Sequence, residues 1–300
     1  MKKSWNKAVL LGLGLFLFLA GIVTGCGSNG GNVQTGASGG SSGTKPTITF
    51  GVTPWTSTIP PTQVAKAILE QMGYTVKLQD ADAGVVYAGL SKGDIDVFMD
   101  AWLPDMHKNY MEKYQGSIED VAVSYPDGEL GWVIPAYVEG IESIEDLKGK
   151  EELFGKKIYG IEEGAGMTIT SREMIQAYGL DLEYQASSEP GMLTQAKRMI
   201  SAKKPILFLG WRPHSMFVRW DLKVLKDPKD FFKTSEVHVL VHKGFDQKAP
   251  EAYQFLKRWS IPVEDVEKMI LNIEDGAKPE DVAKEWIKNN QDKVNQMMGK

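Results

Sequence analysis

The chain has 300 residues, of which 42% are hydrophobic and 24% are charged, and it carries a net charge of −5. Because no stripe of Lys and Arg interrupts this acidic balance, nucleic acids and anionic membrane surfaces are not expected as partners. The length is sufficient for one large domain or two medium domains with substantial hydrophobic cores.

The first 25 residues follow the three-part plan of a secretory leader. Lysines at positions 2, 3 and 7 precede an apolar segment, Ala8 to Val23, and small residues lead up to Cys26. The tetrapeptide Val23-Thr24-Gly25-Cys26 resembles a bacterial lipobox, in which the cysteine is lipidated and becomes the first residue of the mature chain. Residues 1–25 are therefore expected to be a lipoprotein signal peptide, and the mature chain to be lipid-anchored on the extracytoplasmic side of the cell membrane. The alternatives are a retained membrane anchor or cleavage at another position.

Residues 26–46 are rich in Gly, Ser, Asn and Thr and almost free of apolar side chains, which predicts a flexible tether. Cys26 is the only cysteine, so the exported domain has neither a disulfide framework nor a thiol nucleophile.

Strand-like and helix-like segments alternate from Thr47 onward. The expected strands cover 48–53, 75–78, 96–101, 157–161, 182–186, 206–209 and 236–241, and two further β-like runs lie within 121–138 around the turn Pro126-Asp127-Gly128. The expected helices cover 61–72, 84–91, 104–114, 167–178, 190–202, 250–259, 262–271 and 279–289.

Alternation of this kind predicts an α/β fold in which mainly parallel sheets are flanked by helices. Two such series indicate two lobes joined by two crossings, which would act as a hinge. The predicted boundaries assign residues 47–134 and 237–300 to the first lobe and residues 135–236 to the second.

Three tryptophans follow the expected strands at equivalent junctions: Trp55, Trp102 and Trp211. In an open α/β sheet, ligands bind outside the carboxyl ends of the strands, so three large aromatic side chains there predict a shared pocket wall. Indole faces bind a quaternary ammonium group well, because this cation has no N–H to donate and its diffuse charge matches π faces. Core packing is the alternative for any one of these residues.

A small-residue loop, Glu162 to Thr168, follows another expected strand and opens a helix. Free backbone N–H groups and the helix dipole make such a helix start an anion site, and glycine allows a ligand to approach the backbone closely. His107 lies five residues beyond Trp102, and a helical turn beginning at Pro104 would bring its imidazole N–H back toward the same crevice. A solvated surface histidine is the alternative for His107.

His238 and His242 share one face of a late strand but have no third ligand in sight, so neither a metal nor another cofactor is expected. A cation site and an anion site in one crevice describe a small zwitterion with a trimethylammonium group.

Four segments of the chain resemble those of the glycine betaine/proline betaine-binding lipoproteins of bacterial ABC importers. The segments are Gly51-Val52-Thr53-Pro54-Trp55, Asp100-Ala101-Trp102-Leu103-Pro104-Asp105-Met106-His107, Gly160-Ile161-Glu162-Glu163-Gly164-Ala165-Gly166-Met167 and Gly210-Trp211-Arg212-Pro213-His214-Ser215-Met216-Phe217. The resemblance covers nearly everything after the tether, and its Trp-Leu-Pro-x-x-His and Trp-x-Pro-His-x-Met-Phe segments are specific.

The resemblance implies a periplasmic-binding-protein-like clamp of type II that closes over its ligand and docks, as a monomer, on the permease of an ABC importer. It further implies that Trp55, Trp102 and Trp211 form a cage around the quaternary ammonium. The backbone amides of Gly166 and Met167 and the side chain of His107 are then expected to hold the carboxylate. The chain would perform no chemistry and would serve osmoprotection.

Three other functions stay open on the sequence alone. A choline or carnitine binder of the same fold is one, since Trp132 or Tyr137 could supply a fourth aromatic wall. A secreted hydrolase, using Asp100 or Asp105 with Glu162 or Glu163 as an acid/base pair, is the second. The third is a surface adhesin without a small-molecule ligand.

Overall fold

The computed structural model describes residues 44–300, which form one compact unit. Cys26, the expected signal peptide and almost all of the expected tether lie outside the described residues. None of the helices in the described part has the length and hydrophobicity needed to cross a bilayer.

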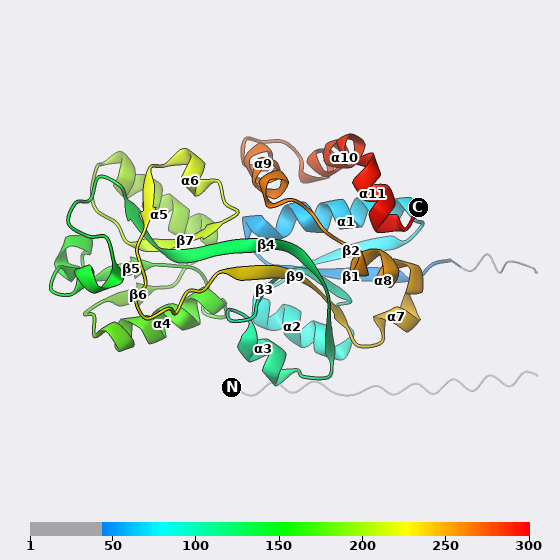
Figure 1. Ribbon diagram of the computed structural model, residues 1–300, viewed down its shortest axis with the longest axis horizontal. Helices are drawn as coiled ribbons and strands as arrows, with labels where there is room; N and C mark the ends of the chain where they lie inside the picture. Colours follow the sequence, from blue (N-terminus) through cyan, green and yellow to red (C-terminus); the bar gives the residue numbers. More distant parts are fainter. Residues whose placement is uncertain (1–43) are drawn as a thin grey trace, which may run out of the picture. The chain divides into compact units, whose positions relative to one another are not determined.

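The strands follow the order β2-β1-β3-β9-β4-β7-β5-β6, with β8 paired to β4 outside this path. We call the elements around β2, β1, β3 and β9 lobe 1, and the elements around β7, β5 and β6 lobe 2 (Figure 1). The long strand β4 (Ile118–Pro135) pairs with β9 of lobe 1 and with β7 of lobe 2, so it belongs to both. The predicted lobe boundary at residue 134 falls at the end of this strand.

Lobe 1 is built on parallel pairing of β1 with β2 and with β3. Its strands are β1 (Thr47–Val52), β2 (Thr75–Asp80), β3 (Val97–Leu103) and β9 (Ser235–His242). Its helices are the 3-10 helix η1 (Thr56–Thr58) and α1 (Ile59–Gln71), α2 (Ala83–Lys92), α3 (Lys108–Lys113), α7 (Phe245–Lys248), α8 (Pro250–Lys257), α9 (Val263–Glu274), α10 (Pro279–Asn289) and α11 (Gln291–Met298).

Every residue of β3 is buried, as expected for a central strand with helices on both faces. In Figure 1, α1, α9 and α10 lie above the lobe 1 sheet, and α2 and α3 lie below it.

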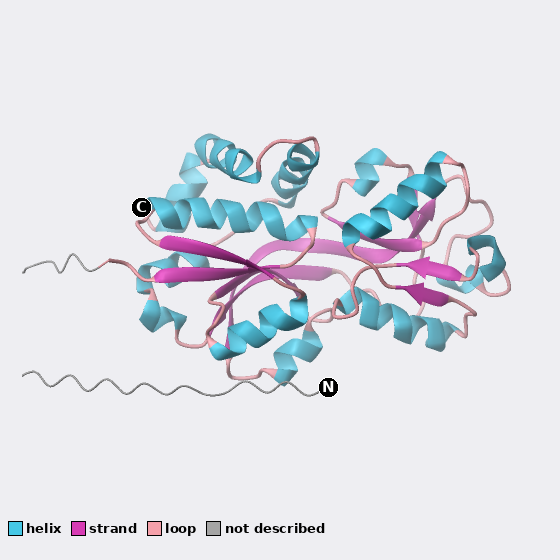
Figure 2. Ribbon diagram, turned by 180° about the vertical axis from the view of Figure 1, so that it is seen from behind, coloured by secondary structure: helices cyan, strands magenta, loops and turns pink. Residues whose placement is uncertain are grey.

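Lobe 2 is smaller and rests on parallel pairing of β5 with β6 and with β7. Its strands are β5 (Lys157–Tyr159), β6 (Glu183–Gln185), β7 (Phe208–Arg212) and β8 (Leu222–Val224). Its helices are η2 (Ile144–Leu147), η3 (Glu151–Phe154), α4 (Gly166–Tyr178), α5 (Glu189–Ser201) and α6 (Met216–Arg219). Helices flank both faces of the lobe 2 sheet as well (Figure 2), so the predicted α/β layering is confirmed.

All antiparallel pairs involve β4, which belongs to both lobes, or β9, its neighbour in lobe 1. The predicted turn at Pro126-Asp127-Gly128 is wrong: β4 continues through these residues as one strand with irregular register toward β9. Asp127 adopts a positive φ of 61°, which fits the turn-like composition. The strand bends there without reversing because it continues to find partners, first β9 and then β7.

Most other predicted elements lie within a few residues of the observed ones. The helix expected from residue 104 begins only at Lys108, because residues 104–107 form turns. The strand expected at 206–209 runs from Phe208 to Arg212, so Trp211 lies inside it. The shifts matter for the site, because they place Trp102 and Trp211 each at the penultimate position of a strand.

Candidate functional site

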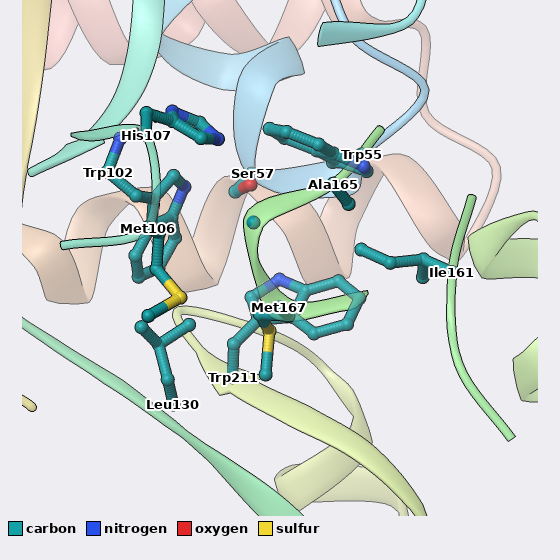
Figure 3. Close-up of a pocket in the computed structure, with 11 residues that line it drawn as sticks. Trp55, Ser57, Trp102, Met106, His107, Leu130, Ile161, Ala165, Met167 and Trp211 are labelled. Atoms are coloured by element: carbon teal, nitrogen blue, oxygen red, sulfur yellow. Dashed lines mark hydrogen bonds between the residues drawn. The ribbon is translucent and has the colours of Figure 1, made fainter. Parts of the chain in front are cut away.

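A cavity lies between the two lobes and holds about 330 Å³ of space not filled by atoms, counting the part that opens to solvent. Its walls are mostly aromatic and aliphatic, which is typical of small-ligand sites. The lining residues are Trp55, Ser57, Trp102, Met106, His107, Leu130, Ile161, Ala165, Gly166, Met167 and Trp211. Figure 3 shows side chains from both lobes facing this space.

The three tryptophans predicted from the strand ends meet at this cavity (Figure 3). Trp55 directly precedes η1, whereas Trp102 and Trp211 are the penultimate residues of β3 and β7. Their exposed fractions are 5%, 4% and 4%, so a ligand could reach the rings only if the lobes moved apart.

Gly128 makes room for one of these rings. A Cβ atom at this position would lie 2.5 Å from Cζ3 of Trp102 and 2.9 Å from the carbonyl oxygen of Ser235, which is closer than real Cβ contacts. The glycine of the wrongly predicted turn therefore lets β4 pass close behind the indole of Trp102.

Two of the indole N–H groups donate to carboxylates. Trp55 Nε1 lies 2.9 Å from Oε1 of Glu162, and Trp102 Nε1 lies 3.1 Å from Oδ1 of Asp100. An N–H of this kind lies in the plane of the indole, so each bond fixes the ring orientation without occupying a π face.

Asp100 is fully buried and accepts further hydrogen bonds at Oδ2 from the hydroxyls of Ser57 and Thr58, at 2.8 and 2.6 Å. Burial raises the pKa of Asp100 to about 6, although its three hydrogen bonds act in the opposite direction. Burial also raises the pKa of Glu162, against its bond from Trp55. Near neutral pH, Asp100 is therefore mainly ionised.

His107 is a buried neutral histidine with a defined tautomer. Burial lowers its pKa to about 3, so the ring is uncharged under physiological conditions. Its Nδ1 accepts the backbone N–H of Trp102 at 3.1 Å, which leaves the single ring proton on Nε2. No acceptor within residues 44–300 pairs with this N–H, and the ring stacks on Trp55 at 5.7 Å between centroids. The ring can therefore donate into the cavity.

The start of α4 forms the opposite wall. Ala165 caps this helix with extended backbone, and the amides of Gly166 and Met167 make no intrahelical hydrogen bond, as is usual in a first turn. A Cβ on Gly166 would lie 2.1 Å from the carbonyl oxygen of Met106 in lobe 1. Glycine is therefore required here for the two lobes to approach as they do.

The cavity thus combines aromatic faces with a small group of N–H donors, and the described residues hold no cluster of His, Cys, Asp and Glu that could bind a metal ion. All six residues predicted for the ammonium and the carboxylate line it: Trp55, Trp102, Trp211, His107, Gly166 and Met167. Their roles toward a ligand stay predictions.

Sequence reasoning missed the other lining residues, because apolar side chains such as Met106 and Leu130 carry no signal of their own. The sequence also left open a fourth aromatic wall, with Trp132 and Tyr137 as the candidates. Neither of these residues lines the cavity. Trp132 is fully buried and donates to Ser171, and Tyr137 lies at the surface and donates to the carbonyl of Lys204.

The fold and this inter-lobe cavity define the class as a solute-binding protein of the periplasmic-binding-protein type. A family described as "Substrate binding domain of ABC-type glycine betaine transport system" matches residues 46–289. The chain belongs to this family.

Individual relatives agree with this class. The glycine betaine/carnitine transport binding protein GbuC of Listeria monocytogenes serotype 1/2a (strain 10403S) is 40% identical over 141 residues, which cover 46% of this chain and 47% of GbuC. The alignment thus spans about half the length of that relative.

Two solved structures match this chain over most of its length. Lactococcal OpuAC, in its closed conformation with glycine betaine, has a TM-score of 0.80 and 32% identity over 85% of this chain and 100% of that one. A choline-binding protein of an ABC transporter, in complex with choline, has a TM-score of 0.80 and 28% identity over 84% of this chain and 91% of that one.

Because the family consists of binding proteins of ABC transporters, the chain is an extracytoplasmic binding protein and not an enzyme. This excludes the hydrolase that the sequence alone left open.

Proposed function

We propose that this protein captures glycine betaine, and also proline betaine, for an ABC importer that supplies osmoprotectants. The single observation that carries the proposal is the meeting of three buried indoles and a set of free N–H donors in one cavity between the lobes.

The indoles of Trp55, Trp102 and Trp211 suit a trimethylammonium group. Each ring face is expected to contribute roughly 0.5–2 kcal/mol to binding of a desolvated cation. The aliphatic neighbours Met106 and Leu130 offer methyl-sized contacts and exclude water, which strengthens electrostatic contacts in the cavity. These features favour a methylated cation over a primary ammonium, which would need hydrogen-bond acceptors.

The other end suits a carboxylate. Burying a carboxylate is unfavourable unless its oxygens find donors. The amides of Gly166 and Met167 stand at a helix N-terminus, where the helix dipole adds to the attraction. The neutral His107 offers a third donor through Nε2, and it does so without requiring protonation.

Binding is proposed to shift the protein toward the closed form, since the ligand would contact both lobes only there. Hydrogen bonds already join the lobes around the cavity. Trp55 Nε1 donates to Glu162, the Thr56 amide donates to Glu189 Oε2 at 3.1 Å, and the Tyr110 hydroxyl donates to the Gly164 carbonyl at 2.8 Å. The permease would recognise this closed form.

A choline or carnitine binder is the second candidate, supported by the named ligands of GbuC and of the choline-binding structure. Calorimetric titration of the purified protein with glycine betaine, proline betaine, carnitine and choline separates the candidates. Glycine betaine should bind at least about tenfold more tightly than choline, because choline leaves the buried N–H donors without an acceptor. Equal affinities would refute the assigned carboxylate end.

We also propose that the protein is a monomer held at the membrane through lipid on Cys26. Metabolic labelling with a fatty acid should label the wild-type protein and not Cys26→Ser. Labelling of the variant would refute the anchor.

A further inference from the structure

Each tryptophan of the proposed cage is backed by a buried or half-buried carboxylate that does not itself line the cavity. Asp100 bonds the indole N–H of Trp102, and Glu162 bonds that of Trp55. The remaining ring, Trp211, is supported through an intermediate side chain.

Trp211 contacts His214 edge to face, with 4.9 Å between the ring centroids and 82° between the planes. His214 Nδ1 accepts the backbone N–H of Met216 at 3.0 Å, so the proton of the neutral ring resides on Nε2. Nε2 lies 3.3 Å from Oε1 of Glu189, close enough for electrostatic attraction although the angle is poor for a hydrogen bond. Glu189 is only 1% exposed, and its other oxygen accepts the amide of Thr56.

Among the described residues, the one basic side chain within 4 Å of these three carboxylates is the imidazole of His214, beside Glu189. Within residues 44–300, no Lys or Arg forms an ion pair with Asp100, Glu162 or Glu189, whereas most ion pairs of the chain lie at its surface. The charge of a buried group is screened far less than that of a surface group. Negative charge behind the rings therefore stays available to attract a cation in the cavity.

We propose that Asp100, Glu162 and Glu189 form an anionic layer behind the cage, which holds the indoles in place and selects a positively charged headgroup without touching it. The inference rests on the proposed function. It adds an explanation of why the cavity would prefer a positively charged headgroup to an uncharged one. The indole faces match the shape and polarizability of the headgroup, and the carboxylates supply a negative electrostatic potential in the cavity. They are positioning residues for the cage and determinants of its specificity.

The test compares two ligands that share a shape. 3,3-Dimethylbutanoate has the same heavy-atom skeleton as glycine betaine, with carbon in place of the ammonium nitrogen. Its headgroup is uncharged and its carboxylate is retained. The ratio of its Kd to that of glycine betaine, measured by calorimetry and by displacement on the full chain, therefore reports the preference for charge alone.

The variants are the amides Asp100→Asn, Glu162→Gln and Glu189→Gln, which keep size and an acceptor oxygen and remove the charge. Each should lower the ratio about threefold to tenfold, by weakening glycine betaine more than its neutral isostere. Glu163→Gln is the matched control, because this neighbouring carboxylate is exposed and pairs with Arg172. It should leave the ratio unchanged.

A parallel loss of affinity for both ligands, with an unchanged ratio, would overturn the proposal and leave the acids a purely structural role. If Asp100→Asn or Glu189→Gln loses its cooperative unfolding transition, the ratio measured for Glu162→Gln decides between the two outcomes. Glu162 is only half buried, so this variant is expected to fold. Failure of the wild-type protein to bind glycine betaine is a separate result and refutes the proposed function instead.

Discussion

The two ends of the cavity are built by different means. At the ammonium end, side chains from β3, β7 and the loop after β1 converge, and hydrogen-bonded carboxylates hold the rings of Trp55 and Trp102. At the carboxylate end, the donors are mainly backbone amides at the start of one helix, together with His107. A diffuse cation is matched by faces that many residues must orient, whereas a compact anion is matched by N–H groups that a helix start presents without side chains.

The comparison predicts that steric change at the backbone end has the largest effect. Gly166→Ala would place Cβ 2.1 Å from the Met106 carbonyl oxygen, so the lobes could not close as observed. The clash with Met106 and the resulting displacement of the Gly166 and Met167 amides should together weaken glycine betaine binding by more than about 100-fold in calorimetry.

Gly164→Ala is the control in the same loop, because its Cβ would lie 3.3 Å from the hydroxyl of Tyr110 and 3.9 Å from the backbone nitrogen of Gly84, without a severe clash. Similar affinities for the two alanine variants would contradict the requirement for glycine at position 166.

Removal of a cage wall is expected to have the next largest effect. Trp102→Ala loses the ring contact and leaves a void in a buried site, which should weaken binding about 30-fold to 100-fold in the same titration. Trp132→Phe changes a fully buried tryptophan outside the cavity. It should lower the melting temperature and leave the affinity nearly unchanged, so an equal loss of affinity in both variants would argue against the cage.

Loss of the imidazole donor should discriminate between ligands. His107→Phe keeps an aromatic ring on Trp55 but removes the Nε2–H. Glycine betaine should bind about tenfold more weakly, because one buried carboxylate contact is lost, while choline binding changes little. Competition of the two ligands by tryptophan fluorescence measures the change. Equal weakening of both would indicate that His107 serves only to pack Trp55 and Trp102.

The smallest expected effect is a pH dependence of glycine betaine affinity, caused by a carboxylate at the ammonium end of the cavity. Asp100, with a pKa of about 6, loses its charge as the pH falls from 7.5 to 5, so glycine betaine affinity should fall about threefold. The hydroxyls of Tyr87 and Tyr125 face Asp100 but stay neutral, since burial raises both pKa values. Glu189 adds negative charge nearby.

The control is Asp100→Asn, whose glycine betaine affinity should depend less on pH over this range; Glu162, whose pKa burial also raises, accounts for the remainder. His107, with a pKa of about 3, stays neutral throughout. Affinity is a better readout than stability, because the two groups act oppositely on folding. The raised pKa of Asp100 stabilises the fold as the pH falls below 6, whereas the lowered pKa of His107 destabilises it as the pH falls below 6.5. If the glycine betaine affinity of Asp100→Asn depended on pH as strongly as that of the wild-type protein, a group other than Asp100 would be responsible.

Local signals were sufficient for much of the fold. Alternating strand and helix patterns, helix stops such as Gly73 and the small-residue loop before Met167 depend on neighbours in sequence, and the structure places those elements within a few residues. The path of β4 was not predictable in this way. This strand carries a turn-like segment and is sustained by partners more than 80 residues away in sequence, as in the pairing of Leu130 with Trp211.

By itself, the sequence determined which chemistry was available: tryptophans near strand ends, a glycine-rich helix start and a histidine close to Trp102. Only the tertiary structure decided that these groups meet in one cavity. It also assigned to Asp100 and Glu189 their places behind the rings, where the sequence had offered Asp100 only as a hydrolase candidate and had not singled out Glu189. Burial, tautomer and close approach, such as that of Gly166 to Met106, arise from packing between distant segments, and no local pattern encodes them.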